Sequence, residues 1–319
     1  MTDRHLVVGA GPVGRHVAEL LAARGSDVTV ATRSGTDTGI AGVVHLQLDA
    51  SDADALSAAA DGVSVLYNCA NPADYTTWET FWPPLMAAFL SAAERSGAVY
   101  AITGNLYPYG PVDRPMREDM PDAATDHKGI LRAKMWADAK AAHDAGRVRA
   151  VEVRGSDYMG RGVGGNGHVT RQIPGALKGK RAWVIGKKDL PHTFTDVLDT
   201  ARMLIAAAED STAHGRTWNV PSNPPRTQEQ AITEVLASVG KPPVAVSATP
   251  AAILSTLALV VPMMRELNQL SYQWTAPYVL DDSAARTHFD MEPTPWQEVC
   301  RRSAEQVTAD SGRISRGTP

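Results

Sequence analysis

The sequence has few cysteines and no excess of charge of one sign. Only Cys69 and Cys300 occur, far apart and without the spacing of metal ligands, so neither a disulfide framework nor a metal site is predicted. Two free thiols fit a reducing compartment, and we expect a cytoplasmic protein. The formal net charge is −4 and no long run of one sign occurs, so we expect no nucleic-acid partner.

Long apolar runs are also absent. The first apolar run, around residues 5–10, is soon broken by glycine and is too short for a signal peptide. Residues 251–264 form the most apolar stretch, but a membrane-spanning helix needs about 20 such residues, and Pro262 interrupts this one. We therefore expect no membrane partner, and we predict that this stretch is a helix of a smaller lobe.

The first half of the chain instead alternates short β-branched runs with alanine-rich segments. Near-continuous apolar strands indicate a parallel sheet that is covered on both faces by helices. The sequence therefore predicts an α/β fold, a doubly wound Rossmann domain over residues 1–157. The six predicted strands read HLVVG, DVTVAT, GVVHLQL, VSVLYNC, AVYAIT and VRAVEVR.

The alternation of strands and helices ends after residue 157, where a glycine-rich loop is followed by mixed strands and helices with many prolines. We predict that residues 158–319 form mainly a smaller substrate-binding lobe, although residues 190–220 could return to the first sheet. Strands are predicted within 181–186, 216–221 and 243–249. Thr227, with Gln230 three positions later, predicts a capping box at the start of a helix.

Three glycines follow the first predicted strand in GAGPVGR and precede a helix. In a dinucleotide-binding turn, Gly9 permits the tight turn, Gly11 lets a pyrophosphate approach the backbone, and Gly14 lets helix and strand pack closely. Free amides at the helix start hold the phosphates. We therefore predict that Gly9, Gly11, Pro12, Val13 and Gly14 bind the cofactor.

The end of the second strand bears on which dinucleotide binds. Domains that bind NAD usually carry an acidic residue about 20 residues beyond the turn, where it bonds the ribose 2′-hydroxyl. Arg33 stands there instead, and its guanidinium suits a 2′-phosphate, with Ser34 and Arg15 as helpers. We favour NADP over NAD; alternatively, Arg33 stacks on the adenine or points to solvent.

Other cofactor contacts are expected at the carboxyl ends of the third and fourth strands. Asp49 could accept a hydrogen bond from the adenine amino group, or it could be a helix cap, and the sequence favours neither. Ala70 and Asn71 follow the fourth strand at the edge of the sheet where ligands bind in such folds.

Several segments in this order resemble the extended and atypical short-chain dehydrogenases/reductases, the group with NAD-dependent epimerases and dehydratases. They are GAGPVGR, LDASD, NCANP, TGNLYPYG and HTFTDVLDTARML, and the resemblance covers most of the chain. It implies hydride transfer between a nicotinamide cofactor and a carbonyl or alcohol of a small molecule. An epimerase that uses transient oxidation is the nearest enzymatic alternative.

The resemblance breaks at the catalytic pair. Family members place a Ser or Thr after the fifth strand, and Thr103 matches it. They also carry Tyr-x-x-x-Lys on the next helix, where this chain has Lys128 and Arg132 and no tyrosine. Like charges four residues apart are unfavourable unless an anion neutralises them. The resemblance implies that Arg132 replaces the family lysine at the cofactor, that Lys128 points toward the reacting groups, and that the anion is the cofactor or an acidic substrate.

Another proton donor is expected in TGNLYPYG, where Tyr109 lies in a segment similar to the family's V-Y-G loop. Tyr107 and Tyr158 are further candidates, although tyrosines over a cleft often only shape the pocket. We therefore predict Thr103, Tyr109 and Lys128 as catalytic residues, while His127 and His192 are expected to be structural.

Two classes of function follow. The first is an NADP-dependent oxidoreductase or epimerase-like enzyme, and the second is a non-catalytic NADP(H)-binding sensor or regulator that has lost the tyrosine chemistry. The apolar, aromatic helix predicted over 78–97 corresponds to a region that often forms a dimer interface in the family, so a homodimer is possible.

Overall fold

The computed structural model describes residues 3–72, 74–250, 253, 256 and 261–314. Its main element is a seven-stranded parallel sheet with the order β10-β6-β5-β4-β1-β2-β3. The strands are β1 (Arg4–Val8), β2 (Asp27–Thr32), β3 (Val43–Gln47), β4 (Val65–Asn68), β5 (Val99–Asn105), β6 (Arg149–Gly155) and β10 (Thr217–Asn219). The predicted doubly wound fold is confirmed, and all six strands expected within residues 1–157 belong to this sheet.

Helices cover both faces of the sheet. On one face lie α1 (Pro12–Ala23) and α6 (Val197–Glu209), and on the other lie α2 (Ala53–Ala59), α3 (Trp78–Ser96) and α4 (His127–Asp144). Successive strand residues point to opposite faces, so Leu6 and Val8 join one core and Val7 joins the other. Trp82 and Phe89, two of the aromatic residues of α3, are buried against the sheet.

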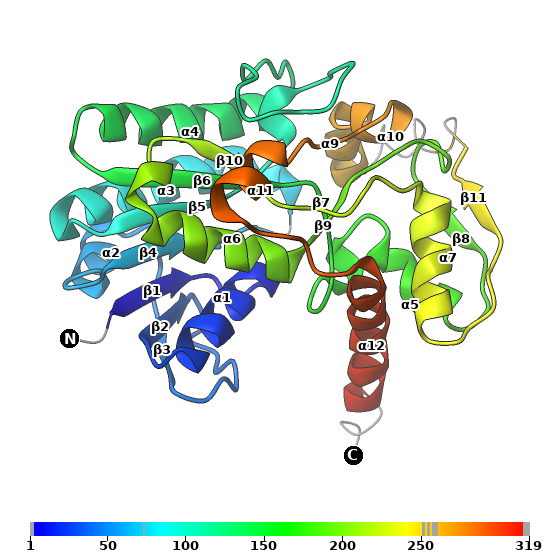
Figure 1. The fold of residues 1–319 in the computed structure, drawn as a ribbon, viewed down its shortest axis with the longest axis horizontal. Coiled ribbons are helices and arrows are strands. Elements are labelled where there is room, and N and C mark those ends of the chain that lie inside the picture. Colours follow the sequence, from blue (N-terminus) through cyan, green and yellow to red (C-terminus); the bar gives the residue numbers. More distant parts are fainter. Residues whose placement is uncertain (1–2, 73, 251–252, 254–255, 257–260, 315–319) are drawn as a thin grey trace.

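A smaller lobe lies beside the sheet (Figure 1). It packs α5 (Ile173–Ala176), β8 (Ala182–Val184), α7 (Gln228–Ser238), β11 (Val246–Ala248) and α12 (Trp296–Ile314) around a core of its own. The capping box predicted at Thr227 and Gln230 is present at the start of α7. Residues 217–219 pair with β6, so this predicted strand belongs to the main sheet.

Short segments join the two parts above the carboxyl ends of the strands. They are η1 (Tyr75–Thr77), η2 (Tyr107–Tyr109), β7 (Asp157–Met159), η3 (Gly164–Asn166), η4 (Thr170–Gln172), β9 (Phe194–Asp196), α9 (Pro262–Gln269) and α10 (Tyr272–Thr275). Two more, η5 (Ser211–Ala213) and α11 (Ser283–Phe289), follow α6 and precede α12. These connections bring distant parts of the chain to the edge where parallel sheets bind ligands.

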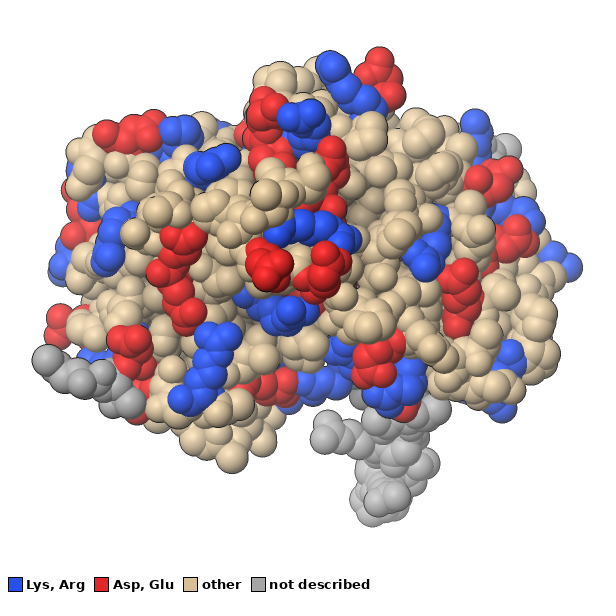
Figure 2. Space-filling view, in the orientation of Figure 1, with Lys and Arg blue, Asp and Glu red and all other residues tan. Residues whose placement is uncertain are grey.

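Most of the apolar stretch 251–264 lies outside the described residues; Ile253 and Thr256 are described and are helical, and α9 begins at Pro262. Pro262 opens α9 instead of interrupting a helix, since proline is compatible with a first helical turn. Among the helices that the structure describes, none has the length and apolar character to cross a bilayer. Acidic and basic side chains are interspersed over the face seen in Figure 2.

Candidate cofactor and substrate cavity

A cavity of about 600 Å³ opens at the carboxyl edge of the sheet. It extends from the glycine turn after β1, past the ends of β2 to β6, to the segments that follow β6 and α9. Of the residues predicted to bind the cofactor, those that line it are Gly9, Gly11, Pro12, Val13, Arg33, Asp49, Ala70, Asn71 and Arg132. One cavity therefore brings together side chains that are far apart in the sequence.

The three glycines of the turn have three different surroundings. Gly9 has a φ of 103°, and a Cβ there would lie 2.6 Å from the carbonyl oxygen of Cys69. A Cβ on Gly14 would lie 2.0 Å from the Gly9 carbonyl oxygen, so this position needs glycine for helix–strand packing. A Cβ on Gly11 would meet nothing within 4 Å. Gly11 also precedes α1, whose first amides have no partner within the helix.

The residues expected near a 2′-phosphate do not all face the cavity. Arg33 lines it and forms no ion pair with any described residue. Ser34 does not line it, and its hydroxyl lies 2.7 Å from the Thr36 hydroxyl. Arg15 donates from Nη2 to the Thr38 carbonyl oxygen at 2.7 Å. Arg33 is therefore the cation of this group that a ligand in the cavity would meet.

Asp49 is not the helix cap that its sequence position allowed, because Asp52 caps α2 (Ala53–Ala59). Oδ1 of Asp49 accepts hydrogen bonds from the Ser51 hydroxyl at 2.7 Å and the Ser51 amide at 3.0 Å, which hold its pKa below the ordinary value. The residue also lines the cavity. The local turn therefore fixes the carboxylate in place beside the space for a ligand.

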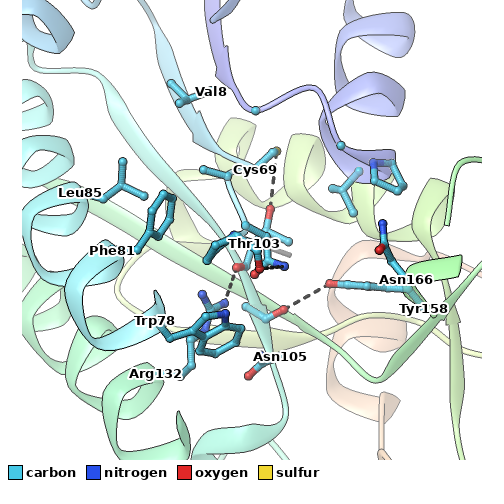
Figure 3. A pocket seen from close by; sticks show the side chains of 18 of the residues that line it. Val8, Cys69, Trp78, Phe81, Leu85, Thr103, Asn105, Arg132, Tyr158 and Asn166 are labelled. Atoms are coloured by element: carbon cyan, nitrogen blue, oxygen red, sulfur yellow. Dashed lines mark hydrogen bonds between the residues drawn. The ribbon is translucent and has the colours of Figure 1, made fainter. Parts of the chain in front are cut away.

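Thr103 and Arg132 lie together in the middle of the cavity (Figure 3). Arg132 donates from Nη2 to the Thr103 carbonyl oxygen at 2.6 Å, and its guanidinium lies 4.8 Å from the Trp82 ring centroid. The Thr103 hydroxyl donates to Cys69 Sγ at 3.6 Å. Arg132 is only 4% exposed, and burial lowers its pKa. No described carboxylate lies within 4 Å of this buried cation, and its Nε has no hydrogen-bond partner.

Lys128 meets a different anion from the one expected. Its ammonium pairs with the Glu266 carboxylate of α9, and Nζ lies 5.7 Å from the Tyr75 ring centroid. The side chain is 3% exposed and is not among the residues that line the cavity. For Lys128 the expectation of a cofactor or substrate anion is corrected, because the partner is a carboxylate of the chain itself.

Tyr109 is also placed away from the cavity. It is buried against Arg154, whose guanidinium lies 4.8 Å from its ring centroid. Tyr107, on the same turn, does line the cavity. Residues two positions apart on a 3₁₀ turn are separated by about 240°, so the two rings of η2 face different surroundings. Tyr158 lines the cavity as well, and its hydroxyl donates to the Gly104 carbonyl oxygen at 3.2 Å.

Tyr75, Asp157 and Gln273 are among the cavity residues that were not predicted from the sequence. The Asp157 carboxylate lies 2.9 Å from Nε2 of His192, and Trp274 donates to it from Nε1 at 3.4 Å. Burial opposes its ionisation, but these two partners hold the pKa of Asp157 at about 2. Its position directly after the sixth strand was a usable signal, whereas nothing local marks Tyr75 or Gln273.

The described residues contain no group of three or more His, Cys, Asp or Glu side chains that could hold a metal ion.

A family model matches residues 5–220, and its description is the NAD-dependent epimerase/dehydratase family. No curated protein sequence matches the chain.

Solved structures share the fold across nearly the whole chain. The epimerase Mth375 of Methanothermobacter thermautotrophicus has a TM-score of 0.81 at 16% identity, covering 99% of this chain and 95% of the other. The UDP-glucose 4-epimerase of Thermus thermophilus, solved with NAD, has a TM-score of 0.76 at 18% identity, with 96% and 99% covered. The UDP-glucuronic acid 4-epimerase of Bacillus cereus, also with NAD, has 0.76 at 15%, with 96% and 99% covered.

Proposed function

Since the chain belongs to the NAD-dependent epimerase/dehydratase family, we propose that it is an NADP-dependent oxidoreductase or epimerase-like enzyme acting on a carbonyl or alcohol of a small molecule. The observation that carries this proposal is the single cavity that joins the glycine turn, Arg33 and Thr103. Its length along the sheet edge suits a dinucleotide whose phosphates lie at Gly11 and whose nicotinamide lies near Thr103. The nicotinamide would supply or accept the hydride.

The preference for NADP rests on Arg33. A guanidinium binds a phosphate through charge-assisted hydrogen bonds, and Arg33 reaches the cavity without a competing carboxylate among the described residues. NAD remains the alternative, because two structural relatives were solved in complex with it.

The protein residues have separable proposed roles. Thr103 would orient the substrate oxygen, and the buried Arg132 beside it would hold the ribose or a phosphate. The other two predicted catalytic residues would have structural roles. Tyr109 would support the site by packing against Arg154, and Lys128 would hold α9 in position through its ion pair with Glu266. Asp157, ionised at neutral pH, would present an acceptor to a hydroxyl of the substrate.

Titration with NADPH and NADH tests the cofactor proposal. We expect NADPH to bind more tightly, by about 10- to 100-fold, since hydrogen bonds to charged groups contribute about 1.5–3 kcal/mol. Arg33→Asp should reverse the preference, because a carboxylate repels the 2′-phosphate and accepts from a 2′-hydroxyl. Arg114→Asp is the matched control, since Arg114 is exposed and lies outside the cavity lining. Equal binding of the two cofactors by the wild type would contradict the role of Arg33.

A second function, an NADP(H)-binding sensor without turnover, is favoured by one observation. The first turn of α4 has no tyrosine, and Glu266 neutralises the lysine that stands there. A panel of aldehydes, ketones and the nucleotide sugars named for the structural relatives separates the two functions. Turnover of NADPH, or conversion of a sugar, establishes the enzyme; tight NADPH binding without any conversion establishes the sensor.

A further inference from the structure

Two tyrosine hydroxyls meet inside the cavity. Tyr75 lies on η1 after β4, Tyr107 lies on η2 after β5, and their oxygens are 2.9 Å apart. Both residues line the cavity together with Thr103. Because β4 and β5 are neighbours in the sheet, their carboxyl ends place these hydroxyls on the same side as the proposed reaction centre.

The pair is held in place by its surroundings. The Trp78 ring stacks on Tyr75 at 4.9 Å and on Tyr107 at 6.1 Å, with interplanar angles of 16° and 25°. The Tyr107 amide donates to Asn105 Oδ1 at 3.1 Å, which fixes the start of η2. A donor that is fixed before the substrate arrives needs no reorganisation during the reaction.

The two hydroxyls are not equivalent. Burial raises the pKa of both, but the hydrogen bond between them lowers the pKa of Tyr75 and raises that of Tyr107. Either hydroxyl can be the donor in this pair, and when Tyr107 donates, the proton of Tyr75 remains for another acceptor. Arg132 also lowers the pKa of Tyr75, whereas Asp157 raises it.

The charged groups around Tyr75 come from several elements. They are Lys128 and Arg132 of α4, Asp157 of β7, Arg171 of η4 and, through its pair with Lys128, Glu266 of α9. In this set Arg171 and Arg132 stabilise the phenolate, and Asp157 opposes it.

We propose that Tyr75 is the proton donor that α4 lacks, and that Tyr107 stabilises its phenolate by donating a hydrogen bond. This inference rests on the proposed function. In the reducing direction the carbonyl carbon gains the hydride from the reduced nicotinamide dinucleotide, and the carbonyl π pair moves to oxygen. That oxygen takes the proton of Tyr75. The electron pair of the broken O–H bond stays on the tyrosine oxygen, which becomes a phenolate. Solvent then reprotonates Tyr75, and oxidation runs through the same steps in reverse.

Another tyrosine of the cavity is less suited to this role. The Tyr158 hydroxyl donates its proton to the Gly104 carbonyl oxygen, and burial raises the pKa of Tyr158. Tyr109, the donor favoured by the sequence, does not reach the cavity.

A spectroscopic titration tests the pair without any substrate. Tyrosine ionisation is followed by ultraviolet difference absorbance as pH rises, in wild type and in Tyr75→Phe, Tyr107→Phe and Tyr67→Phe. We expect Tyr75→Phe to remove the first ionisation step and Tyr107→Phe to move it to higher pH. Tyr67→Phe is the matched control, since Tyr67 is buried outside the cavity and its hydroxyl has no described partner. A first step that survives Tyr75→Phe overturns the inference.

Kinetics of the cofactor-loaded enzyme form the second arm. Tyr75→Phe should lower kcat by about 10²- to 10⁴-fold, the usual contribution of general acid–base catalysis, while the Kd for NADPH stays unchanged. Tyr107→Phe should lower kcat less and shift the kcat–pH profile upward. An unchanged kcat in Tyr75→Phe, or a larger loss in Tyr109→Phe, overturns the inference. If the wild type converts nothing in the panel, the proposed enzyme fails, and the titration still decides whether Tyr75 ionises first.

Discussion

Gly11→Ala should separate cofactor binding from folding. Gly11 has a φ of −69° and a ψ of −177°, an extended conformation that alanine adopts without strain. Its added methyl group would meet no protein atom within 4 Å. Alanine also restricts the unfolded chain, so we expect the free energy of unfolding to rise by about 0.4–1 kcal/mol.

The same methyl group would occupy the space proposed for the pyrophosphate. It would prevent the close approach that lets backbone amides at the start of α1 bond the phosphates. Loss of one hydrogen bond to a charged group costs about 1.5–3 kcal/mol. At 1.4 kcal/mol per tenfold, this weakens NADPH binding by about 10- to 150-fold. Fluorescence titration gives the Kd, and urea unfolding gives the stability.

Gly14→Ala is the control, in which we expect stability to fall and cofactor binding to be affected only indirectly. Its methyl group would lie 2.0 Å from the Gly9 carbonyl oxygen, so α1 must shift away from the strand. Overpacking of this kind costs about 1–3 kcal/mol of stability, and binding should weaken only as a consequence. If Gly11→Ala binds NADPH as tightly as the wild type, the pyrophosphate does not lie at this turn and the reasoning is refuted.

Three further substitutions test other parts of the structure. Arg154→Leu should lower the free energy of unfolding by about 3–5 kcal/mol in urea, because it leaves a buried carboxylate of β6 unpaired. Burial raises the Asp196 pKa to about 6 from an ordinary 3.8. As pH rises, Asp196 therefore ionises in the unfolded chain before it does so in the folded protein. The free energy of unfolding consequently falls between pH 3.8 and about pH 6. At 1.36 kcal/mol per unit the loss reaches about 3 kcal/mol. Asp196→Asn keeps a capping side chain and should remove this slope, so its gain in Tm over wild type should grow from pH 4 to pH 6 and then stay constant. Lys128→Met leaves Glu266 unpaired and should loosen α9, raising the substrate KM while the NADPH Kd stays unchanged.

The sheet could be predicted from the sequence because its signals are local. Six β-branched runs, most of them followed by a helical segment, indicate a doubly wound fold, and the glycine turn is recognised from its spacing. The placement of α6 and β10 depends on packing against α1 and β6, which are far away in the sequence. Local patterns could therefore suggest a return to the sheet without establishing it.

The cavity residues that could be predicted from the sequence are those that lie at the carboxyl ends of strands. Arg33, Asp49, Ala70 and Asn71 follow strands and Thr103 lies near the end of β5, and parallel strands bring their carboxyl ends to one edge. The choice between Tyr107 and Tyr109 depends instead on the rotation of a single 3₁₀ turn, which no composition or spacing encodes. The partner of Lys128 lies 138 residues away, on a helix whose position was not predictable.

The first turn of α4 links these observations. Asp126 caps it by accepting a hydrogen bond from the Gly129 amide at 2.8 Å. A Cβ on Gly129 would lie 2.6 Å from the Tyr107 carbonyl oxygen, so glycine there lets α4 pack directly against η2. One residue earlier, Lys128 lies against the Tyr75 ring while its pair with Glu266 brings α9 over the same region. The turn that lacks the family tyrosine thus contacts both members of the tyrosine pair. On this reasoning the acidic hydroxyl has moved from α4 to η1, and Lys128 serves to position it.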